Sequence, residues 1–394
     1  TNLGTVVTED CRGSGCYDGS YVYDASHALP TRTGPALRGP SAGAAAAAPV
    51  PAPPTCTPAP AAGRLAALEM DVWGGSNSLV VRDAGSGAEL GRGVAPDIMT
   101  AVGAVGNPMT QIDPHRSYFF LTTGGDTEYE ASLFTFDISN MPTPHMVHNC
   151  THDKTDFGRH TPMFVLWDAR GSELWAMTQS AEWGPLSIDT CKLDKRFTTP
   201  QIAGNAATTA SIDAAAGVVY QIGTPAGGKP MAASTAGAIG AIPTTFSRTT
   251  LDLFVVTLST GAVAHKLLTN VPYSSSGIVY YVFADAPSNE LVVVGKGEDA
   301  TTVSTLAAPM SAPSPSAMVD APSSPFEVGA TALTYAPDAH AVLAQVYRGG
   351  YKSTVYTIDT TTPLAASSGI VSNQGLPYGA AWAPAAARAE GMDA

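Results

Sequence analysis

I-D-P-H-R-S-Y-F-F-L, residues 112–121, places an apolar residue before Asp, then a polar turn, then a β-prone run. The same order returns in four other segments: W-D-A-R-G-S-E-L-W-A-M (167–177), I-D-A-A-A-G-V-V-Y-Q-I (212–222), A-D-A-P-S-N-E-L-V-V-V (284–294) and, more loosely, A-P-D-A-H-A-V-L-A-Q-V (336–346). The runs are solidly apolar or alternating over a few residues, which excludes a helical solenoid and indicates strands. The chain is therefore built from a β repeat.

A second pattern, a strand running into a polar turn, follows the first at a steady distance. It comprises L-V-V-R-D-A-G-S-G (79–87), L-F-T-F-D-I-S-N (133–140), L-S-I-D-T-C-K (186–192), F-V-V-T-L-S-T-G (254–261), V-S-T-L-A-A-P (303–309) and V-Y-T-I-D-T-T-T (355–362). The residues in register in the first pattern are Asp113, Asp168, Asp213, Asp285 and Asp338. Those in the second pattern are Asp83, Asp137, Asp189, Leu258, Leu306 and Asp359. From each residue of the first pattern to the next residue of the second, the separations are 24, 21, 45, 21 and 21 residues. A loop rich in Gly and Ala accounts for the long one.

A period of about 50 residues with some four short strands is typical of a β-propeller blade. The recurring Asp of the first pattern has a structural explanation, because its carboxylate can accept backbone N–H bonds and fix the turn after the innermost strand. The first repeat lacks an opening strand, and G-A-A-W-A-P-A-A-A-R near the end (379–388) supplies one. Pairing the two ends closes the ring and removes open edges. We expect an all-β, six-bladed propeller over residues 64–394, with seven blades as the alternative if the long insertion hides one.

Two further segments precede the repeats. Residues 1–33 form an N-terminal arm with short β-prone runs around the loop C-R-G-S-G-C. This arm either folds back on its own propeller or adds to an exposed strand of another subunit. Residues 34–63 alternate Pro with Ala, Gly and Ser, which cannot hold a helix and favours an extended polyproline-type stalk.

The composition excludes some classes of function. Charged residues make up 13% of the chain and the net charge is −13, without a basic run, so nucleic-acid binding is not expected. No apolar stretch reaches the roughly 18 residues of a membrane span. A chain that begins at Thr1 is the expected form of a secreted product without its signal peptide.

Five cysteines fit an oxidising compartment. Cys11 and Cys16 can close a small ring within the arm. Cys150 and Cys191 lie about one repeat apart, so adjacent blades can bring them together. Cys56 is left over in the stalk and is either unpaired or available for an intermolecular bond. No zinc site is expected, because no C-x-x-C ligand pair is present.

The stalk segment A-P-V-P-A-P-P and the later S-A-P-S-P-S resemble the hydroxyproline-rich segments of green-algal and plant extracellular glycoproteins. That resemblance implies hydroxylated, O-glycosylated prolines, with Pro49, Pro51, Pro53, Pro54, Pro58, Pro60, Pro313 and Pro315 as candidates. Separately, Asn149-Cys150-Thr151 is an N-glycosylation sequon. Covalent glycans are the only non-protein groups expected, and no cofactor is.

The His-rich segment H-M-V-H-N-C-T-H-D-K-T-D-F-G-R-H (145–160) is a weaker metal candidate. His148, His152, Asp153 and His160 have ligand side chains, together with His145 and Asp156, but a polar loop between blades explains them equally well. No catalytic motif such as G-x-S-x-G or a P-loop occurs. The five tryptophans, Trp73, Trp167, Trp175, Trp183 and Trp382, are expected in the core, with an exposed subset able to stack on sugars.

Three hypotheses of function follow. The first is a structural glycoprotein of the cell surface that self-associates into a coat or fibril, without catalytic activity. The second is a carbohydrate-binding or adhesive propeller that uses grooves between blades. The third is a metal-dependent propeller enzyme of the lactonase or hydrolase type, which needs acidic and amide side chains on the central axis.

Overall fold

The structure is a computed structural model of the 394-residue chain. It divides into two compact units, Thr1–Cys56 and Thr57–Ala394. It describes residues 4–7, 10–11, 16–17, 20–23, 63–70, 77–95, 109–113, 116–123, 132–139, 143–150, 162–178, 180–202, 210–223, 247–273, 279–296, 301–322, 324, 326, 332–349, 352–363, 365–372 and 376–384.

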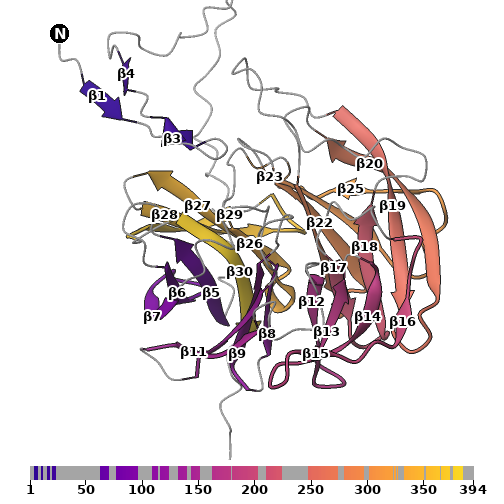
Figure 1. The fold of residues 1–394 in the computed structure, drawn as a ribbon. Coiled ribbons are helices and arrows are strands. Elements are labelled where there is room, and N and C mark those ends of the chain that lie inside the picture. Colours follow the sequence, from indigo (N-terminus) through magenta and orange to yellow (C-terminus); the bar gives the residue numbers. More distant parts are fainter. Residues whose placement is uncertain are drawn as a thin grey trace, which may run out of the picture. The chain divides into compact units, whose positions relative to one another are not determined.

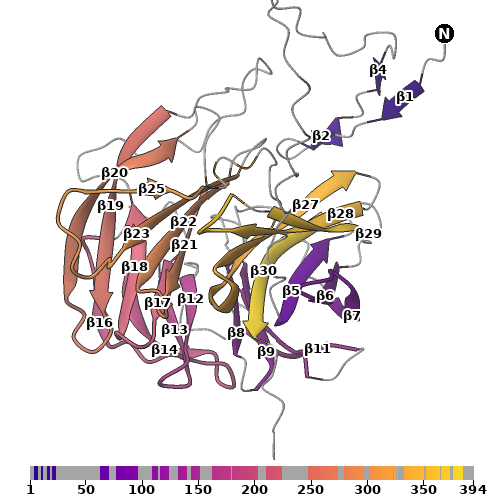
Figure 2. The same cartoon turned by 180° about the vertical axis from the view of Figure 1, so that it is seen from behind.

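The second unit is a six-bladed β-propeller, in which six small sheets stand in a ring (Figure 1, Figure 2). Blade 1 consists of β30 (Leu376–Pro384), β5 (Gly63–Met70), β6 (Asn77–Asp83) and β7 (Glu89–Ala95), from the axis outward. Blade 2 consists of β8 (Met109–Asp113), β9 (Tyr118–Thr123), β10 (Ser132–Asp137) and β11 (His145–Cys150). Blade 3 consists of β12 (Pro162–Asp168), β13 (Glu173–Thr178), β14 (Glu182–Ser187), β15 (Lys192–Leu193) and β16 (Phe197–Thr198).

Blades 4 to 6 complete the ring. Blade 4 consists of β17 (Ala210–Asp213), β18 (Val218–Gly223), β19 (Ser247–Thr257) and β20 (Val263–Tyr273), with β24 (Ser316–Ala317) added to its outer edge. Blade 5 consists of β21 (Val279–Asp285), β22 (Glu290–Lys296), β23 (Thr301–Ala307) and β25 (Val319–Asp320). Blade 6 consists of β26 (Ala332–Ala336), β27 (Ala341–Gly349), β28 (Lys352–Asp359) and β29 (Ala365–Ser372), with the 3-10 turn η2 (Pro337–Ala339) after β26.

The predicted closure of the ring is confirmed. The C-terminal strand β30 is the innermost strand of blade 1 and pairs antiparallel with β5, from Leu376 opposite Met70 to Pro384 opposite Gly63. The predicted alternative of seven blades is not observed, since the described strands form six propeller sheets. The long insertion falls between β18 and β19 of blade 4, outside the described residues.

The core lies between the blades. Each of six buried apolar clusters joins one blade to the next, and neighbouring residues of a strand serve opposite clusters. In β5, Ala66 and Leu68 pack toward blade 2, whereas Leu65 and Ala67 pack toward blade 6. Because both faces of such strands are buried, their sequences are apolar without alternation.

The turns after the innermost strands confirm the predicted role of Asp in four blades. The Oδ1 atoms of Asp113, Asp168, Asp213 and Asp285 accept backbone N–H bonds from residues two or three positions ahead, at 2.9 to 3.3 Å. The register assigned to Asp338 is wrong. In blade 6 the equivalent position is Ala336, and Asp338 is exposed in η2. Pro337 explains the change, since its fixed φ favours the first position of a helical turn.

The second pattern marks the ends of the third strands, and its register holds at Asp83, Asp137 and Asp359. It is wrong at Asp189, Leu258 and Leu306, because those strands end at Ser187, Thr257 and Ala307. In blade 3, Ser187 Oγ accepts the Thr190 N–H at 3.3 Å. A hydroxyl therefore caps that turn in place of the expected carboxylate.

The N-terminal unit contains two small antiparallel pairs. Strand β1 (Gly4–Val7) pairs with β4 (Ser20–Tyr23), and β2 (Asp10–Cys11) pairs with β3 (Cys16–Tyr17). The backbone register sets Cys11 opposite Cys16. The disulfide predicted between them concerns side chains outside the described part of the chain and stays a prediction.

Candidate functional site

The structure contains a cavity of about 280 Å³ where the six innermost strands converge. It lies along the last residues of these strands, next to the Asp turns. All six blades line it, with Thr110, Gln111, Ile112, Trp167, Ala210, Ser211, Tyr281, Val282, Phe283, Ala284, Leu333, Thr334, Tyr335, Pro337, Ala380, Ala381, Trp382, Ala383 and Pro384. We call this space the axial cavity.

Aromatic rings form part of its wall. The rings of Tyr281, Phe283 and Tyr335 stack in sequence, with centroids 6.4 and 5.8 Å apart, and join blade 5 to blade 6. Trp167 stacks on Phe120 at 6.0 Å, and the Arg116 guanidinium lies 5.3 Å from the Trp167 ring. Phe283 is half-buried, whereas Trp167 and Tyr335 are buried. The wall is therefore rigid where the rings interlock.

The lining is uncharged. It contains one side-chain amide, Gln111, and the hydroxyls of Thr110, Ser211, Thr334, Tyr281 and Tyr335, but no carboxylate or basic group. The four turn carboxylates stand one or two residues beyond the lining of their strands and are bound to their own turns. Acidic ligands of a metal-dependent enzyme are thus not presented by the residues that line this cavity.

A polar cluster around the buried Asp285 carboxylate joins blades 5 and 6 at the same end of the cavity. The Tyr335 hydroxyl donates to Asp285 Oδ2 at 2.8 Å, and His340 Nδ1 lies 3.0 Å from the same oxygen. Burial, together with the bond to Asp285, raises the pKa of Tyr335 above its ordinary value. Ser288 Oγ also contacts His340 Nδ1, at 3.1 Å. A Ser-His-Asp triad needs the hydroxyl and the carboxylate on opposite ring nitrogens, so this arrangement holds the turn rather than activating Ser288.

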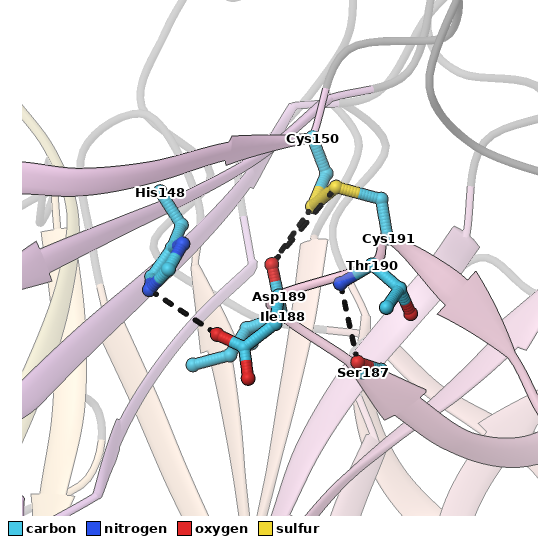
Figure 3. Close-up of a disulfide and its surroundings, with 7 residues drawn as sticks. All are labelled: His148, Cys150, Ser187, Ile188, Asp189, Thr190 and Cys191. Atoms are coloured by element: carbon cyan, nitrogen blue, oxygen red, sulfur yellow. Dashed lines mark hydrogen bonds and ion pairs between the residues drawn. A yellow bond between two sulfur atoms is a disulfide. The ribbon is translucent and has the colours of Figure 1, made fainter.

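The disulfide predicted between Cys150 and Cys191 is present and buried (Figure 3). It links the outer strand β11 of blade 2 to the β14–β15 turn of blade 3, with Cα atoms 5.4 Å apart. The two cysteines belong to the apolar cluster between these blades. The bond therefore fastens the outer rim of one blade to the next.

The metal candidates are divided by the structure. His152, Asp153 and His160, with Asp156, lie outside the described residues. His148 is on β11, and its Nε2 lies 3.5 Å from Asp189 Oδ1 of blade 3 (Figure 3). No group of three or more His, Cys, Asp or Glu side chains suited to a metal occurs among the described residues. Metal binding by His152, Asp153 and His160 thus stays a prediction.

The glycosylation candidates also fall in different places. The stalk prolines Pro49, Pro51, Pro53, Pro54, Pro58 and Pro60, and Cys56, lie outside the described part of the chain. Asn149 is half-buried on β11, beside the disulfide. Pro313 and Pro315 are exposed, in the segment that connects β23 to β24.

That second proline segment is held firmly against blade 4. The Lys266 ammonium donates to the carbonyls of Pro309, Met310 and Ala312 at 2.6 to 2.8 Å. Strand β24 then pairs in parallel with β20, from Leu268 opposite Ser316 to Thr269 opposite Ala317. Residues 308–317 of blade 5 thus cover the outer edge of blade 4, which protects an otherwise open strand. We call residues 308–317 the rim segment.

Sequence reasoning found the tryptophans of the core. Trp167, Trp175 and Trp183 are buried, and the Trp183 indole N–H donates to Thr199 Oγ1 at 2.8 Å. Trp382 is half-buried and lines the axial cavity, and Trp73 lies outside the described residues. The axial cavity itself was missed, because its lining comes from six segments with no common motif.

No model of a known protein family matches this chain, and no curated protein matches its sequence. Solved structures with a similar arrangement include a chain of a nidogen/laminin complex, with a TM-score of 0.48 and 11% identity, over 82% of this chain and 98% of the other. A candidate 6-phosphogluconolactonase from Bacteroides uniformis has a TM-score of 0.45 and 12% identity, over 82% and 99%. The Dos1 propeller has a TM-score of 0.34 and 10% identity, over 76% and 65%. At these values the likenesses say nothing of activity, and the fold rests on the six sheets themselves.

Among the described residues, no helix is both long and apolar enough to cross a membrane.

Proposed function

We propose that this protein is a structural glycoprotein of the cell surface, in which the propeller is a scaffold within a coat or fibril. The observation that carries the proposal is the rim segment. Its two candidate prolines are exposed at the periphery of the ring, while their backbone is fixed by Lys266 and β20. A fixed, exposed proline is accessible to a modifying enzyme without unfolding of the blade.

The buried disulfide supports the same proposal. Such bonds form and persist in secreted and extracellular proteins and are rare where thiols are kept reduced. In the proposed assembly, the propeller would be exposed to an oxidising medium, and a covalent link between blades 2 and 3 resists opening of the ring. The N-terminal unit, Thr1–Cys56, would supply the contact between subunits. Cys56 would provide an intermolecular bond.

Peptide mapping by mass spectrometry of protein from its native source tests the glycoprotein proposal. We expect the peptide with Pro313 and Pro315 to carry hydroxylation and sugar masses that chemical deglycosylation removes. Pro337, half-buried beside the axial cavity, is the matched control and is expected without modification. An unmodified rim segment in native material would overturn the proposal for this site.

Electron microscopy of the native particle tests assembly. We expect elongated or sheet-like polymers that shorten when the chain lacks residues 1–56. A monodisperse monomer in native material would contradict a structural role. Polymers of unchanged length in the chain without residues 1–56 would contradict the role of that segment.

The axial cavity gives no support to the lactonase- or hydrolase-type alternative, because its lining presents no acidic metal ligand.

A further inference from the structure

The backbone groups that face the axial cavity can be identified from two hydrogen bonds. Gln111 Oε1 of blade 2 lies 3.5 Å from the Trp167 amide of blade 3, and Ser211 Oγ of blade 4 accepts the Ala284 amide of blade 5 at 2.9 Å. In both cases the donor is the second-to-last residue of its innermost strand. The acceptor is the third-to-last residue of the innermost strand in the preceding blade. These amides bond to another blade, so they point away from their own sheet.

The same register holds in blades 2 to 6. The equivalents of Trp167 and Ala284 are Ile112, Ile212 and Tyr335, each one pair from the end of its ladder. In an antiparallel ladder, residues alternate between those that bond to the neighbouring strand and those whose N–H and C=O face outward. The innermost strands of blades 2 to 6 therefore each present a donor and an acceptor to the axis.

Only some of these amides face a side chain that can accept a bond. Gln111 and Ser211 serve blades 3 and 5. The side chains at this position before blades 2, 4 and 6 are Trp382, Leu166 and Phe283, which have no acceptor. The preceding blade thus offers no side-chain acceptor at this position to the amides of Ile112, Ile212 and Tyr335. These three amides belong to blades 2, 4 and 6, which alternate around the ring.

We infer that the axial cavity binds one neutral sugar ring. Hydroxyl groups both donate and accept, which suits outward-facing N–H and C=O groups at alternate blades. The half-buried ring of Trp382 offers an apolar face for the C–H side of a sugar, and the half-buried Phe283, stacked between Tyr281 and Tyr335, adds apolar lining. The absence of charged side chains from the lining disfavours an anionic or cationic ligand, which would lose its hydration without a counter-charge.

The size of the cavity restricts the ligand further. Pockets for drug-sized ligands span about 300–1,000 Å³. At about 280 Å³, the axial cavity suits a single ring rather than an oligosaccharide. The ligand is therefore a free monosaccharide or the terminal residue of a glycan, and the inference does not depend on the proposed role as a surface glycoprotein.

Calorimetric and fluorescence titrations of the full-length chain test this inference. The probes are free neutral pentoses and hexoses, the corresponding disaccharides, and glucuronate and glucose 6-phosphate as charged counterparts. We expect saturable binding of at least one neutral sugar at millimolar concentrations, and about ten-fold weaker binding of its charged counterpart. Binding of the disaccharide with equal affinity indicates a glycan end as ligand, and weaker binding of the disaccharide indicates a free sugar.

Phe283→Ala is the informative variant, and Phe326→Ala is its matched control. Both side chains are half-buried and pack on the same apolar cluster between blades 5 and 6, but only Phe283 lines the axial cavity. We expect about ten-fold loss of affinity in the first and none in the second. Phe283→Leu, which keeps the apolar volume, gives the same test if Phe283→Ala does not fold. Absence of saturable binding, equal binding of charged sugars, or equal effects of the two positions would each overturn the inference.

Discussion

Removal of the disulfide by the double substitution Cys150→Ala and Cys191→Ala is expected to destabilise the propeller substantially. The two cysteines are 41 residues apart in sequence, so the bond closes a large loop in the unfolded chain. Loop-closure entropy for that length corresponds to about 4 kcal/mol at 25 °C. Both side chains are buried, and alanine leaves no unsatisfied polar group in their place.

The assay is equilibrium unfolding in urea, followed by the fluorescence of the buried tryptophans, of which Trp167 lies in the same apolar cluster as the disulfide. We expect the free energy of unfolding to fall by about 4 kcal/mol and the slope against urea to increase, since an unconstrained chain exposes more surface. The control is the unaltered protein under reducing denaturation, which should match the variant. A loss below about 1 kcal/mol would refute the reasoning.

Three other predictions concern stability. Arg82→Met removes the partner whose Nη2 lies 2.8 Å from the buried Glu69 carboxylate and leaves Glu69 paired with Arg92 alone, at 3.0 Å. Urea unfolding should show a loss of about 1–3 kcal/mol that Glu69→Gln in the same chain partly restores. A loss unchanged by the second substitution would contradict a charge effect. At Asp359, burial is the largest single effect and raises the pKa of the carboxyl, but the hydrogen bonds from Thr361 and Thr362 together outweigh it and lower the pKa overall. This group therefore stabilises the fold above its ordinary pKa of about 4 and ceases to do so as the pH falls through the lowered value. Unfolding of Asp359→Asn should therefore differ from that of the unaltered protein at pH 7 and approach it near pH 3; a constant difference would exclude the carboxylate as the cause. Finally, a chain that ends after β29 lacks β30, so β5 is left without its inner partner. Thermal unfolding of this chain, followed by circular dichroism, should lose its cooperativity. A cooperative transition close to that of the full chain would show that closure is dispensable.

The repeat, the number of blades and the closure of the ring were all predicted from the residues before the fold was known. These follow from local chemistry, because an Asp that caps a turn acts on amides two or three residues ahead, and a strand is apolar where both of its faces are buried. The same local chemistry explains the errors in register. At Ala336, Pro337 replaces the capped turn with a 3-10 turn, and at Ser187 a hydroxyl takes the place of a carboxylate. Residue type alone does not reveal such substitutions.

Which residues face the axis and the rim depends on contacts between blades, which residue patterns along the chain do not predict. The axial cavity assembles single residues from six segments distant in sequence, and its outward-facing amides depend on the ladder register of each blade. The rim segment was predicted only as a proline tract, yet its exposure and rigidity come from Lys266 on a different blade. Such contacts depend on the closure of the ring, which brings strands together irrespective of their separation along the chain.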